Sequence, residues 1–281
     1  MKFWLLAITA LVVTPQAERI TIRVAPSPNQ VVRMRASQEV TMTGEPEDAA
    51  GGTPATPGMA MAMTSSFDYT MTVGLPNGQG RYEARIVCDS ANATMTLNGQ
   101  PMPIPFSQTA GAVFTIVYDA DGRSVDIAGG SEAGATWSVR QFLQGVLGES
   151  TTLTLAVGET VTRPMTLSIP IPGPASLSSN VTVAAAYTLQ SVTSVGGARI
   201  AHLTTSSAAT FTPKSAGASP VTMGMKMSGE GTADMNLDLG LSTASVQVMT
   251  IDGVMTPGSS GPALSSIRMR GTVKTSSRII D

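Results

Sequence analysis

The sequence is poor in the residues on which most active sites and disulfide scaffolds depend. Its 281 residues include one cysteine, Cys88, and one histidine, His202. One cysteine excludes an intramolecular disulfide, and one histidine excludes a multi-histidine metal site. No nucleophile elbow, P-loop or dinucleotide-binding fingerprint occurs. We therefore expect a protein that is not an enzyme and that holds neither a metal nor another cofactor.

Charged residues are also scarce. They make up 13% of the chain, whereas about 25% is typical of globular domains. The 17 Lys and Arg and 19 Asp and Glu leave a net charge of −2, without the basic patch or stripe of a nucleic-acid-binding protein. Ser, Thr, Gly and Ala replace the missing charge, a composition that suits strands and turns. We expect no nucleic-acid partner and a large core, since 42% of the residues are hydrophobic.

Long apolar segments are missing apart from one at the N-terminus. Lys2 precedes an apolar run of about ten residues, Phe3 to Val13, and the small residue Ala17 follows, which is the order of a secretory signal peptide. A membrane-spanning helix needs about 20 apolar residues, and no later segment reaches that length. We therefore expect a signal peptide over 1–17 and a bacterial protein exported to the periplasm or secreted, with no transmembrane segment.

Apolar and polar residues alternate over long stretches of the chain. The even positions of 30–43 and the odd positions of 59–73 are mostly apolar. A period of two indicates half-buried strands, and strands of this length, at about 3.3 Å per residue, need a strongly twisted sheet. Further strands are expected at 19–24, 80–97, 112–119, 123–128, 151–156, 164–169, 181–194, 198–210, 221–238, 244–251 and 265–279. We predict a mainly β fold, a long and strongly curved antiparallel meander that forms a half-barrel or an open barrel.

Two local signals refine the strand prediction. Within 80–97 the apolar residues move from even to odd positions, which predicts a bulge near Asp89 and Ser90. The run Asp119-Ala120-Asp121-Gly122 between two alternating segments predicts a hairpin turn with its glycine in the left-handed region.

One helix and one loop interrupt the β pattern. Helical spacing of apolar residues predicts an amphipathic helix at about 136–147 that packs on the sheet. The helical face consists of Val139, Phe142, Leu143, Val146 and Leu147. A segment rich in Gly and Pro predicts a flexible loop at 44–58. No segment has the character of a linker between domains, so we expect residues 18–281 to form a single domain.

Methionine supplies the most distinctive candidate site. The pattern Met-x-Met-x-Met occurs at 59–63 and again at 223–227, and on a strand each trio lines one face. Three interpretations are open: an adaptable filler of the core, the lining of a cavity for a hydrophobic ligand, or soft thioether ligands for Cu(I). The candidate ligand-binding face consists of Met59, Met61, Met63, Phe67, Tyr69, Met223, Met225 and Met227.

The export signal, the long strands at 30–43 and 59–73, the Asp-x-Asp-Gly hairpin at 119–122 and the central helix together resemble a family of uncharacterised bacterial exported proteins. More distantly, the arrangement resembles the lipoprotein-carrier half-barrels of the LolA and LppX type. The resemblance implies a curved antiparallel sheet whose apolar concave face shelters acyl chains.

Two functions follow as hypotheses. The first is an exported carrier or binder of a lipid or other hydrophobic small molecule. The alternative is a structural or surface protein of the cell envelope, with a filled core and no ligand. An interior apolar pocket larger than about 300 Å³ would favour binding, and close packing throughout would favour the structural alternative.

Overall fold

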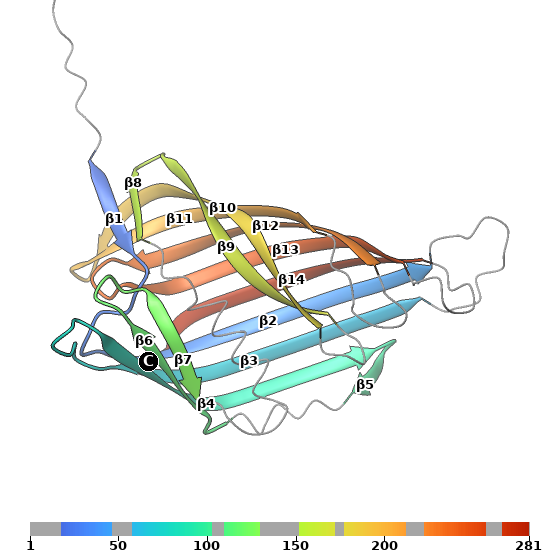
Figure 1. Cartoon of the computed structure of the whole chain (residues 1–281), viewed down its shortest axis with the longest axis horizontal. Helices are drawn as coiled ribbons and strands as arrows, with labels where there is room; N and C mark the ends of the chain where they lie inside the picture. The colour runs from blue at the N-terminus through green and yellow to red at the C-terminus, as the bar shows by residue number, and fades with distance from the viewer. Residues whose placement is uncertain are drawn as a thin grey trace, which may run out of the picture.

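The computed structural model describes residues 18–46, 58–102, 110–129, 152–171, 177–211, 222–256 and 266–280. These residues form antiparallel strands, and the predicted mainly β fold is confirmed (Figure 1). The strands are β1 (Arg19–Arg23), β2 (Val31–Pro46), β3 (Met59–Val73), β4 (Tyr82–Leu97), β5 (Gln100–Met102), β6 (Val113–Tyr118), β7 (Ser124–Gly129), β8 (Thr152–Ala156), β9 (Thr160–Ile171), β10 (Leu177–Val195), β11 (Ala198–Phe211), β12 (Thr222–Asn236), β13 (Leu241–Thr256) and β14 (Ile267–Ile280).

Two halves of the chain build one continuous 12-stranded sheet. Its strand order is β7-β6-β4-β3-β2-β14-β13-β12-β11-β10-β9, with β5 paired to β4. In the first half of the chain, successive strands lead from β2 at the centre of the sheet to β7 at one edge. In the second half, they lead from β9 at the other edge back to β14 at the centre. The two halves meet where β14 pairs with β2, from Ile267 opposite Pro46 to Ile280 opposite Arg33. This pairing is the long-range step on which the whole sheet depends.

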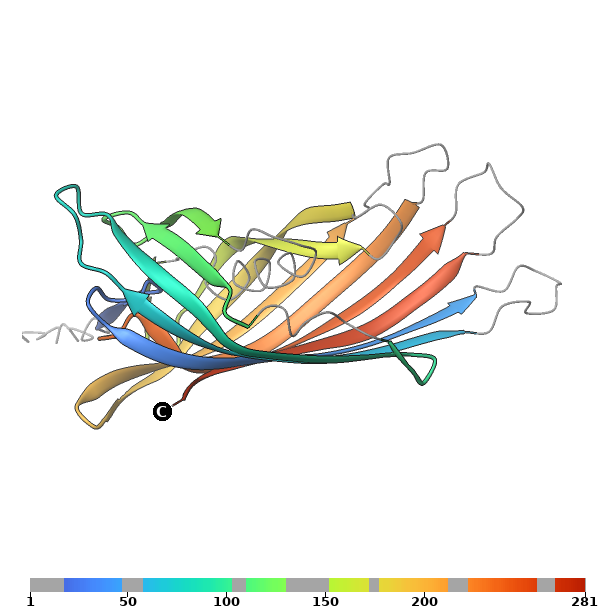
Figure 2. The same ribbon diagram turned by 90° about the horizontal axis from the view of Figure 1, so that it is seen from below.

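The sheet curves into an open trough (Figure 2). Its edge strands are β7 and β9, which do not pair with each other in the described part of the chain. The edge strand β9 contains Pro164 and Pro170, which have no N–H group to donate and so discourage pairing with another chain. The described strands thus form an open curved sheet and not a closed barrel.

Strand alternation gives the trough an apolar concave face and a polar convex face. On β2, Met34 and Ala36 are buried on the concave side, and Arg33 and Arg35 are exposed on the convex side. Arg35 donates two hydrogen bonds to Asp68 of β3, from Nε at 2.6 Å and from Nη2 at 2.7 Å. The guanidinium holds the pKa of the Asp68 carboxyl below its ordinary value. Charged groups therefore pair with one another on the face that water reaches.

Both local refinements of the strand prediction are confirmed. Asp68 lies opposite Ser90 and Tyr69 opposite Cys88, so Asp89 is the extra residue of a bulge in β4. Between β6 and β7 the chain turns with Gly122 at φ 80°, and the Gly122 N–H donates to the Asp119 carbonyl at 2.9 Å. Glycine meets no penalty in this left-handed conformation.

Three apolar clusters occupy the concave face. The largest lies on β2, β3, β4 and β6 and includes Met71 and Phe114, both 0% exposed. The second forms where the small sheet of β1 and β8 covers β10 to β12, around Ile22 and Leu189. The third lies on β12, β13 and β14, and its buried members are Met225, Met227, Ile251 and Met269.

Some predictions fall outside the described residues or need correction. The signal peptide at 1–17 and the helix at about 136–147 lie outside the described ranges. The start of the loop predicted at 44–58 is wrong, because β2 continues to Pro46 and Gly44 still pairs with Met59 of β3, and residues 47–57 lie outside the described ranges. Among the described residues, no helix has both the length and the apolar character needed to cross a membrane.

Candidate ligand-binding face

The predicted face divides between a filled core and a more open region. Phe67 and Tyr69 are 4% and 2% exposed in the largest apolar cluster. The Tyr69 hydroxyl donates a hydrogen bond to Met34 Sδ at 3.3 Å, and burial raises the pKa of Tyr69 well above its ordinary value. These two aromatic residues therefore fill the core. Met59 is 40% exposed near the strand end, and the side chain of Met223 lies outside the described part of the structure.

The open region of the concave face is a methionine strip across β3, β2, β14, β13 and β12. Its buried side chains include Met225 and Met269, whereas Met61, Met63 and Met249 are only partly buried. Along β14 the strip extends from Ile267 to Val273, about 20 Å at the rise of a strand. The strip consists of Met42, Met61, Met63, Met225, Met227, Met249, Ile251, Ile267, Met269 and Val273.

Methionine side chains of the strip lie over glycines of the neighbouring strands. A methyl group added to Gly271 would lie 2.9 Å from Met42 Cγ, and one added to Gly253 would lie 3.0 Å from Met225 Cγ. Curvature crowds neighbouring side chains on the concave face. A glycine on one strand therefore leaves room for the long methionine side chain of the next strand. Methionine suits this role because its thioether chain adapts to irregular gaps.

The two methionine trios share a face but do not meet. Strands β2, β14 and β13 separate β3 from β12. Four strand-to-strand steps amount to about 19 Å along the sheet. Between Met61 and Met227 the cross-strand row contains Met42, Gly271 and Ile251. Because Cu–S bonds are far shorter than this separation, one copper ion cannot be bound by both trios. The arrangement instead provides a continuous apolar surface.

Cys88 lies among core residues and lacks the setting of a nucleophile. Its side chain is buried in the largest cluster, and its Sγ donates a long hydrogen bond of 3.5 Å to the Ser90 carbonyl. Burial is the main reason that the pKa of the thiol rises to about 11. A reactive cysteine needs a lowered pKa, so Cys88 has a structural role.

The structure brings together one polar group that sequence reasoning missed. His202 Nδ1 lies 2.7 Å from Asp234 Oδ1, and His202 Nε2 lies 2.9 Å from Thr193 Oγ1. A bulge in β10 before Ser191 brings Thr193 into reach of the imidazole. Carboxylate, imidazole and hydroxyl stand in the order that activates a nucleophile. No local sequence pattern could have revealed this hydrogen-bonded group, because its three residues come from three strands and meet only through the strand register.

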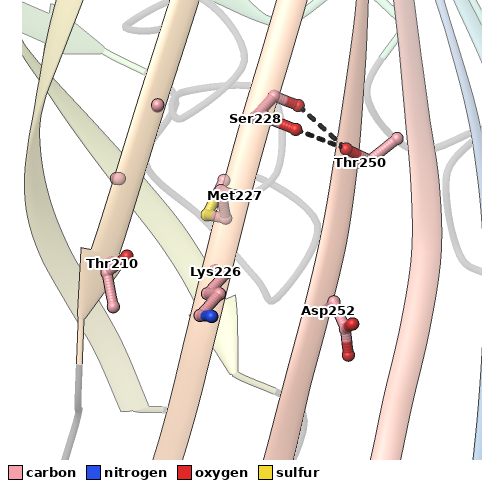
Figure 3. Close-up of a pocket in the computed structure, with 8 residues that line it drawn as sticks. Thr210, Lys226, Met227, Ser228, Thr250 and Asp252 are labelled. Atoms are coloured by element: carbon pink, nitrogen blue, oxygen red, sulfur yellow. Dashed lines mark hydrogen bonds between the residues drawn. The ribbon is translucent and has the colours of Figure 1, made fainter.

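A shallow pocket lies on the convex face and shares only Met227 with the methionine strip (Figure 3). It has a volume of about 430 Å³ and lies across β11, β12 and β13. Lys226 and Asp252 supply its charges, and the Arg268 guanidinium holds the pKa of the Asp252 carboxyl below its ordinary value. Of the predicted ligand-binding residues only Met227 lines it, and the His202 group lies elsewhere. The pocket lining combines these two charged groups and three hydroxyls with Ala208, Ala209 and Met227.

No protein-family model matches the chain, and no curated protein matches it significantly.

Proposed function

We propose that this protein is an exported, non-enzymatic carrier or binder of a lipid or other hydrophobic small molecule, held against the methionine strip. The observation that carries the proposal is a difference in burial along one face. Met71 and Phe114 of the largest cluster are 0% exposed, whereas Met61, Met63 and Met249 of the strip remain partly accessible. Apolar side chains that stay accessible on a concave surface are the usual lining of a hydrophobic ligand site.

The chemistry of the strip supports the same proposal. Its residues carry no charge, and the charged side chains of the same strands, such as Lys274 and Glu230, lie on the convex face. An acyl chain lying along the strip would therefore meet thioether and aliphatic groups only. Methionine faces accept ligands of varied shape because their side chains can repack.

One observation favours the structural alternative. Met225, Met227, Ile251 and Met269 are already buried, and the contacts between methionines and glycines fill much of the surface that a ligand would need. If the remaining side chains are equally well packed in solution, the trough is a filled core. The protein would then serve as a structural component of the cell envelope.

Native mass spectrometry separates the two functions. The protein is purified from its own envelope without detergent, its mass is measured under native conditions, and bound lipid is extracted and identified. We expect a mass increment that disappears on extraction. Purified protein that carries no lipid and does not enhance the emission of an environment-sensitive fluorescent acyl probe would overturn the proposal and leave the structural alternative.

Variants of the strip locate the site. Met63→Gln and Met249→Gln place a polar amide on the concave face at nearly unchanged volume. Thr64→Gln and Val248→Gln make the same replacement one residue away, on the convex face. Binding of the acyl probe should weaken in the first pair and persist in the second. Equal loss in both pairs would show that probe binding does not depend on the strip.

A further inference from the structure

A band of polar side chains crosses the concave face between the methionine strip and the two larger apolar clusters. Along β14, Val273 of the strip is followed on this face by Thr275, and along β13, Met249 is followed by Gln247. The same row continues to Gln38 of β2. The polar band consists of Gln38, Ser65, Thr205, Ser207, Gln247 and Thr275.

The polar groups gather above two glycines of β12. A methyl group added to Gly229 would lie 2.9 Å from Ser207 Oγ and 3.7 Å from Gln247 Nε2. One added to Gly231 would lie 2.9 Å from Thr205 Oγ1. The hydroxyls of Ser207 and Thr205 and the amide of Gln247 therefore lie close to the backbone of β12, where the two glycines have no side chains.

Five members of the band are unpaired, whereas several other hydroxyl groups of the sheet bond to one another across neighbouring strands. On the convex face, Thr41 and Thr272 share a hydrogen bond of 2.7 Å, and Ser228 and Thr250 do the same. On the concave face, Ser245 and Ser277 pair at 2.8 Å. Among the described residues, no side chain of Gln38, Thr205, Ser207, Gln247 or Thr275 has a hydrogen-bond partner. Partly buried polar groups without partners in the protein are expected to bind water or a ligand.

We propose that the polar band binds the uncharged polar head of an amphiphile, an ester, amide or hydroxyl group, while its hydrocarbon chain lies along the methionine strip. This inference rests on the proposed function and specifies its ligand class. The band supplies donors and acceptors without formal charge, so it can satisfy a neutral head but cannot neutralise a phosphate or carboxylate. An anionic head placed there would lose hydration without gaining a counter-charge from any member of the band.

The test compares three probes of equal chain length: a monoacylglycerol, the corresponding lysophosphatidic acid and the plain alkane. Each displaces the fluorescent acyl probe from the full mature chain. The band variants are Gln247→Leu and Thr205→Val, and the matched control is Thr204→Val on the convex face of the same strand. Urea titration of each variant by circular dichroism establishes that it is folded.

We expect the monoacylglycerol to bind more tightly than the other two probes. Each band variant should weaken monoacylglycerol binding by about fivefold, the value of one hydrogen bond, and leave alkane binding unchanged or stronger. The Thr204→Val variant should bind like the wild type. Equal affinity for all three probes, or band variants that lose no monoacylglycerol affinity, would overturn this inference and leave the proposed function intact. Failure of every probe to bind the wild type would overturn both.

Discussion

The difference in burial between the core and the methionine strip predicts different costs for the same mutation. Met71 and Met63 both lie on the concave face of β3, eight residues apart. Met71 is 0% exposed and lies between Val32 and Ile86 of the adjacent strands. Met63 is only partly buried. Replacing each by alanine holds the residue type, strand and face constant, so effects on the unfolded chain should largely cancel.

The expected magnitudes follow from burial. Met71→Ala removes a fully buried side chain and leaves a cavity that its neighbours cannot fill completely, so it should cost about 2–5 kcal/mol in the free energy of unfolding. Met63→Ala loses only part of the transfer free energy and opens no sealed cavity, because the site already faces the trough. Its cost should be about 1 kcal/mol.

Equilibrium urea unfolding, followed by far-ultraviolet circular dichroism, measures both costs. The two variants should share the wild-type dependence on urea concentration, and only their midpoints should shift. A cost for Met63→Ala within about 0.5 kcal/mol of that for Met71→Ala would refute the distinction between strip and core. It would also remove the main support for a ligand on this face.

Three further predictions concern the fold. Gly271→Ala should destabilise the protein by about 1–3 kcal/mol in the same urea assay, because the new methyl group would lie 2.5 Å from the Thr41 carbonyl oxygen; a neutral result would contradict the close contact of β14 with β2. Cys88 should resist a thiol reagent at pH 8 in the native protein and react after unfolding in urea, since burial raises its pKa to about 11; rapid native labelling would contradict its burial. Because the folded pKa of Asp68 is lowered by Arg35, its contribution is present above the unfolded pKa of about 3.9 and is lost as pH falls through the folded pKa. The melting temperature of Asp68→Asn should therefore lie below that of the wild type at pH 7 and approach it near pH 2, and a constant difference would refute this assignment.

Much of the fold could be predicted from local sequence patterns. Alternation placed the strands at 30–43 and 59–73 close to their observed bounds, and a change of parity located the bulge at Asp89. These signals are local, because the alternation of apolar and polar residues within one strand indicates which of its faces is buried. The short strand β5 carried no such signal, since Gln100–Met102 is too brief to show a period.

The arrangement of the candidate site could not be predicted in the same way. The two trios are conspicuous in the sequence, but the residues that connect them, Met42 and Met269, reach the strip only because β14 pairs with β2. Strand order and register are long-range properties that no single strand encodes. For the same reason the sequence gives no sign that Gln38 and Gln247 lie in one row across β14.

Curvature links the fold to the proposed function. A sheet bent this strongly crowds its concave face, and the chain relieves the crowding with Gly253 and Gly271, where a larger residue would clash with the backbone of a neighbouring strand. Methionine side chains fill the space beside these glycines, Met225 at Gly253 and Met42 at Gly271. The resulting surface is apolar, and its flexible methionine side chains can adapt to irregular gaps. In the function that we propose, a flexible hydrocarbon chain would replace one set of apolar contacts on this face with another.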